Sequence, residues 1–169
     1  MRLVAPAAAR TAALERFRQS YFAADEGVET LGALAVHARI SDWLKEAEQL
    51  SRIHTTPDGR IPRKQWLYMR EDGEILGLLQ IRFMLNAWYR QYAGHIGYTI
   101  RPDERRKGYA SQLLREAIPL CHDLGISPIL VCCERENEAS IRTILKNGGR
   151  YESTAVEPQT RAHICRYWI

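Results

Sequence analysis

A cluster of basic residues followed by a glycine stands at the predicted start of a helix, where phosphate oxygens could bind. Arg105, Arg106, Lys107 and Gly108 follow the apolar segment 96–100. A helix N-terminus presents unpaired N–H groups and the positive end of the helix dipole, and glycine adopts backbone angles closed to other residues. Such a turn binds phosphate well. Its side-chain charge would suit a ligand with several phosphates rather than a single carboxylate.

Other interpretations of this turn explain less. A solvated basic surface is the simplest alternative, but cations at a helix N-terminus oppose the dipole and need another cause. The spacing lacks the Gly-Lys-Ser/Thr of a Walker A loop and the G-x-G-x-x-G of a dinucleotide-binding turn. The sequence therefore favours a phosphate-binding turn of a different class.

The pattern R-x-x-G-x-A over residues 105–110 resembles the acyl-coenzyme A pyrophosphate loop of the GNAT superfamily of N-acetyltransferases. Asn137 with Ser140 after a predicted strand, and then residues 147–149 before another, is similar to the second half of that family's cofactor site. The likeness covers nearly all 169 residues. Several short stretches also resemble a bacterial subgroup usually described only as predicted acetyltransferases: Pro62, 81–82, 85–86, 94–98 and 166–168.

This resemblance implies an α/β fold with a mixed, mostly antiparallel sheet of six to seven strands. About four helices would flank the sheet, and its central strands would splay apart. One domain would span residues 1–169, with the cofactor-binding core at about 66–157. The donor would be acetyl-coenzyme A, without a metal, and the acetyl group would pass to a primary amine of a small molecule, peptide or protein. The amine would attack directly in a ternary complex.

The resemblance also assigns roles to individual residues. The backbone of residues 98–100 would pair with the pantetheine arm, and the amides of residues 106–110 would hold the pyrophosphate. An amide near Tyr98 would polarise the thioester carbonyl. Asn137 would bind the pantetheine arm, although Asn is also a common helix N-cap, and Ser140 would serve the helix start or the cofactor edge. The implied cofactor-binding residues are Tyr98, Thr99, Ile100, Arg105, Arg106, Lys107, Gly108, Tyr109, Ala110, Asn137 and Ser140.

Catalytic groups are less well marked. Many relatives carry a tyrosine, as acid for the leaving thiolate, seven residues after the position of Asn137, but this chain has Ile144 there. Tyr98, Tyr109 or Tyr151 could replace it, or solvent could suffice. The candidates for catalysis are His95, Tyr98 and Glu134.

The two candidate bases each have a structural alternative. His95 has an ordinary pKa of about 6.5, which suits a base, but strand alternation places it on the face opposite Tyr98. That placement favours a packing role. Glu134 ends a strand and could act through water, or be a simple exposed carboxylate. For the acceptor amine, Arg82, Asn86 and Trp88 are candidates, together with the helix that contains Trp43 and the loop 55–62.

Hydrophobic periodicity predicts the elements that must position these residues. An Asp72-Gly73 step predicts a hairpin, Ser41 and Asp42 offer caps for the second helix, and Pro119 should kink the third. Strands are predicted at 2–4, 66–70, 75–83, 96–100, 129–133, 150–155 and 163–168, and helices at 8–24, from about 41 to before Pro57, at 110–124 and at 138–146.

Composition limits the remaining classes. An apolar share of 46% and a charged share of 26% are ordinary globular proportions, so collagen-like and wholly disordered chains are excluded. No stretch approaches the roughly 20 apolar residues of a membrane helix, and Arg10 and Glu15 interrupt the early Ala run before a secretory segment could form. The four cysteines form no C-x-x-C pair, which favours reduced thiols in a cytoplasmic protein.

Two further function classes stay open. A non-catalytic coenzyme A-binding or regulatory protein would explain Ile144 and the missing base. A nucleic-acid-binding module would suit the net charge of +4, but no nucleic-acid fold signature is present. We therefore expect acetyl-coenzyme A and an amine as partners, with neither nucleic acid nor a membrane. The strand that ends the chain could support a homodimer.

Overall fold

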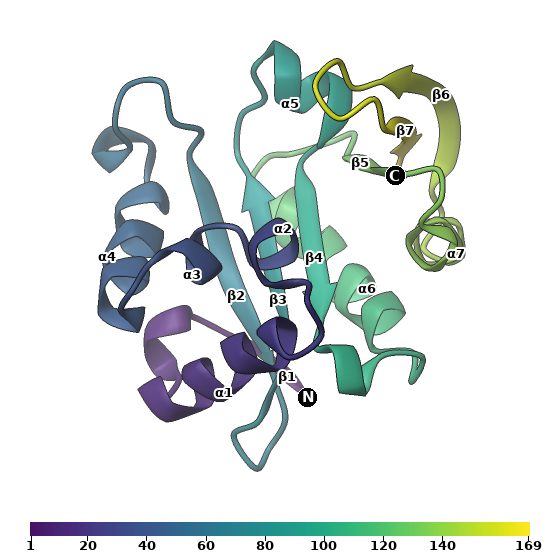
Figure 1. The fold of residues 1–169 in the computed structure, drawn as a ribbon. Coiled ribbons are helices and arrows are strands. Elements are labelled where there is room, and N and C mark those ends of the chain that lie inside the picture. Colours follow the sequence, from purple (N-terminus) through teal and green to yellow (C-terminus); the bar gives the residue numbers. More distant parts are fainter.

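A seven-stranded sheet forms the centre of the molecule (Figure 1). This computed structural model describes residues 1–169 except the side chains at positions 28 and 29. Its strands lie in the order β1-β2-β3-β4-β5-β7-β6, and each described pairing is antiparallel except that of β4 with β5. The predicted mixed sheet is confirmed. The strands are β1 Arg2–Val4, β2 Arg63–Met69, β3 Ile75–Arg82, β4 Ile96–Ile100, β5 Leu130–Glu134, β6 Arg150–Val156 and β7 His163–Trp168.

The central strands β4 and β5 separate along most of their length (Figure 1). Ile96 opposite Val131 is the single register pair between these two described strands, and an isolated bridge joins Gly94 to Val131. Gly94 has a φ of +68°, and a Cβ there would lie 2.4 Å from the Leu130 carbonyl oxygen. Glycine therefore permits the close approach at one end of the gap. Toward Ile100 the strands diverge, as predicted.

Four longer helices match the sequence prediction, and three short ones do not appear in it. The longer helices are α1 Thr11–Phe22, α4 Ile40–Leu50, α6 Tyr109–Asp123 and α7 Glu138–Lys146. The short ones are α2 Gly27–Leu31, α3 Ala33–Val36 and α5 Ala87–Tyr92. Four to six residues are too few for a recognisable helical period, so pattern analysis could not find them.

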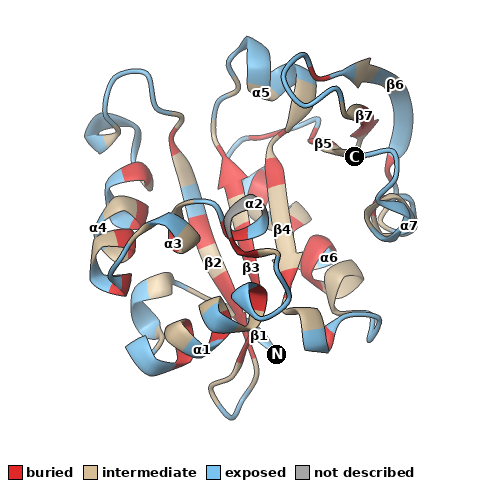
Figure 2. Cartoon of the chain, in the orientation of Figure 1, coloured by how far each residue is buried: buried red, intermediate tan, exposed pale blue. Residues whose placement is uncertain are grey.

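Buried residues form one cluster on each face of the sheet. Figure 2 marks them in red along the strands and on the helices that cover the sheet. Successive strand residues point to opposite faces, so Leu78 and Leu79 of β3 join different clusters. Phe17 of α1 and Trp43 of α4 pack on the Leu78 side, whereas Leu113 of α6 packs on the Leu79 side. Both faces of β3 are thus covered, and Ile96 and Ile100 of β4 join the Leu79 cluster. The Trp43 side chain is fully buried in the cluster on the Leu78 side.

Some local predictions about the helices are wrong. Neither Ser41 nor Asp42 caps α4: the N-cap is Arg39, without a side-chain bond, and Asp42 lies in the first turn, 3.5 Å from the Arg39 guanidinium. An acidic side chain in the first turn still interacts favourably with the positive end of the helix dipole. Helix α6 continues through Pro119 as one element, so the proline does not end it, and the kink there stays a prediction. Pro119 and Arg115 are both exposed, so water can bond the Arg115 carbonyl that the proline leaves unpaired.

Two predicted starts are shifted. β2 begins at Arg63 rather than Trp66, and α1 begins at Thr11 rather than Ala8, after a 3-10 turn over residues 6–8. None of the described helices has both the length and the apolar character that a membrane span needs.

Candidate active site

The gap between β4 and β5 exposes main-chain hydrogen-bonding groups of β4. On its other side, β4 pairs with β3, where Arg101 N–H donates to the Leu76 carbonyl and Arg82 N–H to the His95 carbonyl. Residues of an antiparallel strand bond alternately to either side. The main-chain groups of Tyr98 and Ile100 therefore point away from β3 and into the gap. An extended amide-containing chain could pair with them as a strand would.

The predicted phosphate-binding turn follows directly after β4. Arg106 has a φ of +63° and Gly108 a φ of +84°, and left-handed residues in a turn let successive N–H groups converge on an anion. Helix α6 then begins, and its first internal bond runs from Gln112 N–H to the Gly108 carbonyl. The N–H groups of residues 109–111 thus have no partner within the helix. They form an anion site at the end of the gap.

Gap and turn open onto one groove of about 860 Å³. Its walls are the end of β4, the first turn of α6 and one face of α7. Of the eleven residues predicted to bind the cofactor, ten line it, and Lys107 does not. Asn147 joins the two helical walls, because its Nδ2 donates to the Ser111 carbonyl at 3.1 Å.

The basic side chains of the turn are largely neutralised by neighbouring acids. Arg105 donates to both carboxylate oxygens of Glu26, at 2.8 and 2.6 Å, and to the Ile100 carbonyl at 3.1 Å. Lys107 lies 2.7 Å from Glu104. Arg106 makes no ion pair with a described side chain, so it is the one unpaired cation among the three of the turn. The prediction that all three cations would serve the ligand is thus not supported by their contacts.

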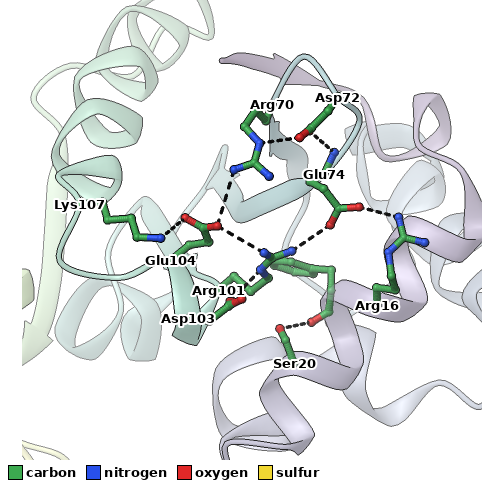
Figure 3. Close-up of polar contacts among 10 residues, drawn as sticks. Arg16, Ser20, Arg70, Asp72, Glu74, Arg101, Asp103, Glu104 and Lys107 are labelled. Carbon is green, nitrogen blue, oxygen red and sulfur yellow. Dashed lines mark hydrogen bonds and ion pairs between the residues drawn. The ribbon is translucent and has the colours of Figure 1, made fainter.

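A second group of charges fixes the turn to the β2–β3 hairpin (Figure 3). Arg101, only 13% exposed, contacts Glu74 at 3.0 Å, Asp103 at 2.8 Å and Glu104 at 3.4 Å. Arg70 lies 3.6 Å from Glu104. These contacts join the segment after β4 to an adjacent loop, and they account for Arg101 without a ligand. Asp103 and Glu104 are both within ion-pair distance of Arg101.

Tyr98 reaches across the groove to α7. Its hydroxyl lies 3.2 Å from the Ser140 hydroxyl, and burial raises its pKa. Asn137 is the N-cap of α7, and its Oδ1 accepts the Ser140 N–H at 3.0 Å. Asn137 also lines the groove, so capping and ligand contact are compatible in one residue. Ile144 is fully buried and presents nothing polar to the groove.

His95 has a main-chain partner rather than a place in the groove. Its Nδ1 accepts the Leu130 N–H at 2.9 Å, which fastens β4 to β5 at the closed end of the gap. Burial lowers the pKa of His95, and the nearby Arg90 and Arg82 lower it further. The lone pair that a base would use is therefore engaged, and its geometry favours a structural role.

The remaining predicted residues separate. Glu134 is exposed at the end of β5 and lines neither this groove nor the next. Asn86 caps α5 by accepting the Tyr89 N–H at 2.9 Å, and the Trp88 indole lies 3.4 Å from Glu157. Of the three acceptor-site candidates, the structure brings only Arg82 to a groove.

That groove, of about 320 Å³, lies on the other side of β4. It shares Thr30, Tyr98 and Thr99 with the first groove, so the two meet at the gap. Sequence analysis missed most of its lining, because these residues come together from β2, β3, α5 and the segment 30–33. The missed polar residues are Thr30, Arg63, Gln65, Gln80 and Tyr89. Alternating polar positions in two apolar strands were the available signal.

Other chemistries find little support among the described residues. No group of three His, Cys, Asp or Glu side chains that could hold a metal is present there. The described cysteines are all free, and burial raises the pKa of Cys132 to about 11 and of Cys133 to about 12. Such thiols are poor nucleophiles at neutral pH.

Comparison with solved structures identifies the same fold in known acetyltransferases. RimL, a ribosomal alpha-N-protein acetyltransferase in complex with coenzyme A, superposes with a TM-score of 0.70 at 17% identity, covering 99% of this chain and 92% of that one. The ribosomal-protein-S5-alanine acetyltransferase of Vibrio fischeri gives 0.70 at 16%, covering 99% and 90%. A spermidine N-acetyltransferase variant from Vibrio cholerae gives 0.60 at 13%, covering 99% and 92%.

Sequence comparison supplies the family. No curated protein sequence matches the chain significantly. The family model described as "Acetyltransferase (GNAT) family" matches residues 28–148, a range that holds the gap, the turn and the start of α7. On this match, the chain belongs to the GNAT acetyltransferase family.

Proposed function

We propose that this protein transfers the acetyl group of acetyl-coenzyme A to a primary amine in a ternary complex. The observation that carries the proposal is the open edge of β4, which leads into an amide-rich turn at the start of α6. The pantetheine arm would pair with the backbone of Tyr98 and Ile100, and the pyrophosphate would lie on the N–H groups of residues 106–110. The alternate orientation of the β4 backbone and the 860 Å³ groove support this placement.

The thioester would then lie where the two grooves meet. An amine in the second groove would approach the carbonyl carbon from the opposite side of β4. As the C–N bond forms, a main-chain N–H near Tyr98 would stabilise the developing oxyanion. The C–S bond then breaks and releases the thiolate of coenzyme A.

The Tyr98 hydroxyl would stabilise that thiolate. The Tyr98 hydroxyl contacts Ser140 and so lies against α7. Many relatives have a tyrosine in this helix, at the position of Ile144. Because burial raises its pKa, the phenol stays protonated at neutral pH and can donate a hydrogen bond to the thiolate.

Removal of the amine proton would fall to water. The three residues that line both grooves, Thr30, Tyr98 and Thr99, carry hydroxyls rather than a carboxylate or an imidazole. Glu26 lies in the first groove, but its bonds to Arg105 lower its pKa and make it a weak base. Water in the second groove can carry the proton to bulk solvent.

Release of free thiol from acetyl-coenzyme A tests this function. The assay would use the full chain with a panel of primary amines of neutral, cationic and anionic character. We expect amine-dependent thiol release with matching N-acetyl product in mass spectrometry. Tight binding of acetyl-coenzyme A without turnover of any amine would instead favour the non-catalytic coenzyme A-binding protein.

A further inference from the structure

The second groove contains a polar stripe that leads to the gap. Arg63 and Arg82 lie opposite each other in the β2–β3 register, and Gln65 lies opposite Gln80 two residues further along. Gln80 in turn lies opposite Gly97 of β4. Residues two apart in a strand share a face, and all five line the groove. Two guanidinium groups therefore stand at one end of the groove, and the backbone of Tyr98 at the other.

Arg82 is a buried cation without a described counter-ion. The residue is only 8% exposed, its Nη1 donates to the Gly94 carbonyl at 3.0 Å, and its guanidinium lies 4.8 Å from the centre of the Tyr89 ring. Among the described side chains no carboxylate approaches it within ion-pair distance, and the ionisable groups that act on it are Tyr89, Arg63 and Cys132. Buried arginines are almost always paired with an anion.

Arg63 has only a shared counter-ion. Its side chain is 14% exposed and lies 3.3 Å from Glu46, and its buried Nε has no hydrogen-bond partner. Glu46 is not available to Arg63 alone, since it also contacts Arg60 at 2.5 Å and His37 at 2.6 Å. One carboxylate thus serves two arginines, and the described lining of the groove contains no acidic residue.

We propose that Arg63 and Arg82 bind an oxyanion of the acceptor, so that the acceptor is a small amine that carries a carboxylate or a phosphate. This inference rests on the proposed function, because it names the substrate class for the same site. Arginine forks match both groups, and a guanidinium in a desolvated site binds them strongly. Three strand residues separate Arg82 from the level of Tyr98, or roughly 10 Å at about 3.3 Å per residue. The arginine side chains cover part of this distance. A short chain between the amine and the oxyanion of the acceptor covers the rest.

The same charges would exclude cationic acceptors. A polyamine such as spermidine would bring several positive charges beside two guanidinium groups, and like charges in a desolvated groove repel strongly. The groove volume of about 320 Å³ also suits a small molecule rather than a folded protein surface.

Matched acceptors test the inference. Acetylation of β-alanine is compared with that of β-alaninamide, and acetylation of O-phosphoethanolamine with that of ethanolamine, with spermidine as the cationic probe. We expect kcat/KM for the better anionic amine to exceed that of its neutral counterpart on the order of 10-fold to 100-fold, and spermidine to be the poorest substrate. Which anionic amine reacts faster distinguishes a carboxylate from a phosphate.

Three variants and one control variant complete the test. Arg82→Gln and Arg63→Gln should bring the ratio of kcat/KM for the anionic amine to that for its neutral counterpart close to one. Arg82→Lys should retain part of this preference. Arg52 is exposed, and Arg52→Gln serves as the control. Unchanged acetyl-coenzyme A binding shows that each variant is folded. If neutral amines and spermidine react as fast as the anionic ones in the wild type, the inference is overturned while the proposed function stands.

A binding measurement decides the case in which no amine reacts. Calorimetry then compares N-acetyl-β-alanine with its primary amide on the protein saturated with coenzyme A. Tighter binding of the acid, lost in Arg82→Gln, supports the inference although the proposed function has failed. Equal or absent binding of the two compounds overturns the inference.

Discussion

The Tyr98 hydroxyl lies 3.2 Å from the Ser140 hydroxyl, across the groove between β4 and α7. This contact brings a phenol to the wall where Ile144 is buried and non-polar. The polar group that many relatives supply from a helix is thus available here from the neighbouring strand.

Tyr98→Phe should therefore lower kcat without weakening acetyl-coenzyme A binding. Loss of a hydrogen bond to the leaving thiolate should cost about 10-fold to 100-fold in kcat, because that bond strengthens as charge develops. Steady-state kinetics of thiol release measure the effect. Tyr151→Phe is the control, since that hydroxyl is exposed on β6 and bonds only to Thr154. An unchanged kcat in Tyr98→Phe would remove Tyr98 from the mechanism.

His95→Asn should leave kcat nearly unchanged, because the asparagine carbonyl can accept the Leu130 N–H in place of Nδ1. The same variant should change the pH dependence of stability. The folded-state pKa of His95 is lowered, so its contribution is complete above its unfolded pKa of about 6.5 and is lost as pH falls through the folded value. Urea unfolding at pH 8 and at pH 5 measures this. The free energy of unfolding should fall less between these two pH values for His95→Asn than for the wild type. If His95→Asn instead has a much lower kcat than the wild type at pH values above 7, where the imidazole is neutral, His95 is the base.

Arg106→Gln should weaken acetyl-coenzyme A binding more than Lys107→Gln does. Arg106 makes no ion pair with a described side chain and lines the groove, whereas Lys107 is paired with Glu104. Because Arg106 would make a charge-assisted contact to phosphate, Arg106→Gln should lower the affinity for acetyl-coenzyme A about 3-fold to 10-fold. Lys107→Gln should lower it less than about 2-fold. Calorimetry at two salt concentrations checks this, since the difference should shrink at high salt. Equal losses would contradict the assignment.

Glu104→Gln should destabilise the fold by about 2 kcal/mol, because it leaves Arg101 partly unpaired in a nearly buried cluster. Glu104 has a side chain only 10% exposed and contacts Arg70, Arg101 and Lys107. Asp103→Asn is a matched control: Asp103 also contacts Arg101 but is 64% exposed, so its loss should cost less than about 1 kcal/mol. Chemical denaturation measures both values. A larger cost for Asp103→Asn would show that burial does not determine these contributions.

Strand and helix patterns in the sequence anticipated the elements of the sheet, because long periodic segments and turn chemistry are local properties, whereas the central gap was implied by the family resemblance. α7 occupies the predicted range 138–146, and the turn before α6 lies where Gly108 placed it. The family resemblance supplied the cofactor groove, and ten of its eleven predicted residues line it.

Side-chain partners could not be anticipated in the same way. Glu26 lies 79 residues before Arg105, and nothing local indicates that it would neutralise the arginine of the motif. His95 was ambiguous for a similar reason, since its role depends on a main-chain donor in β5. The proposed oxyanion site at Arg63 and Arg82 needs the β2–β3 register, which places the arginines at the two outer ends of one hairpin side by side.

The central claim is that the amides at the start of α6 hold the pyrophosphate. The most direct test is to measure acetyl-coenzyme A binding to two glycine variants. Gly108 and Gly125 lie just before and just after α6, both have positive φ, with values of +84° and +73°, and a Cβ at either position would meet no atom within 4 Å. Substitution by alanine should therefore strain both turns alike, at about 1 kcal/mol each. Calorimetry should find that Gly108→Ala binds acetyl-coenzyme A about 3-fold to 5-fold more weakly, because converging N–H groups need the left-handed backbone. Gly125→Ala should bind it as the wild type does. Equal affinities for Gly108→Ala and the wild type would contradict this account of the cofactor site.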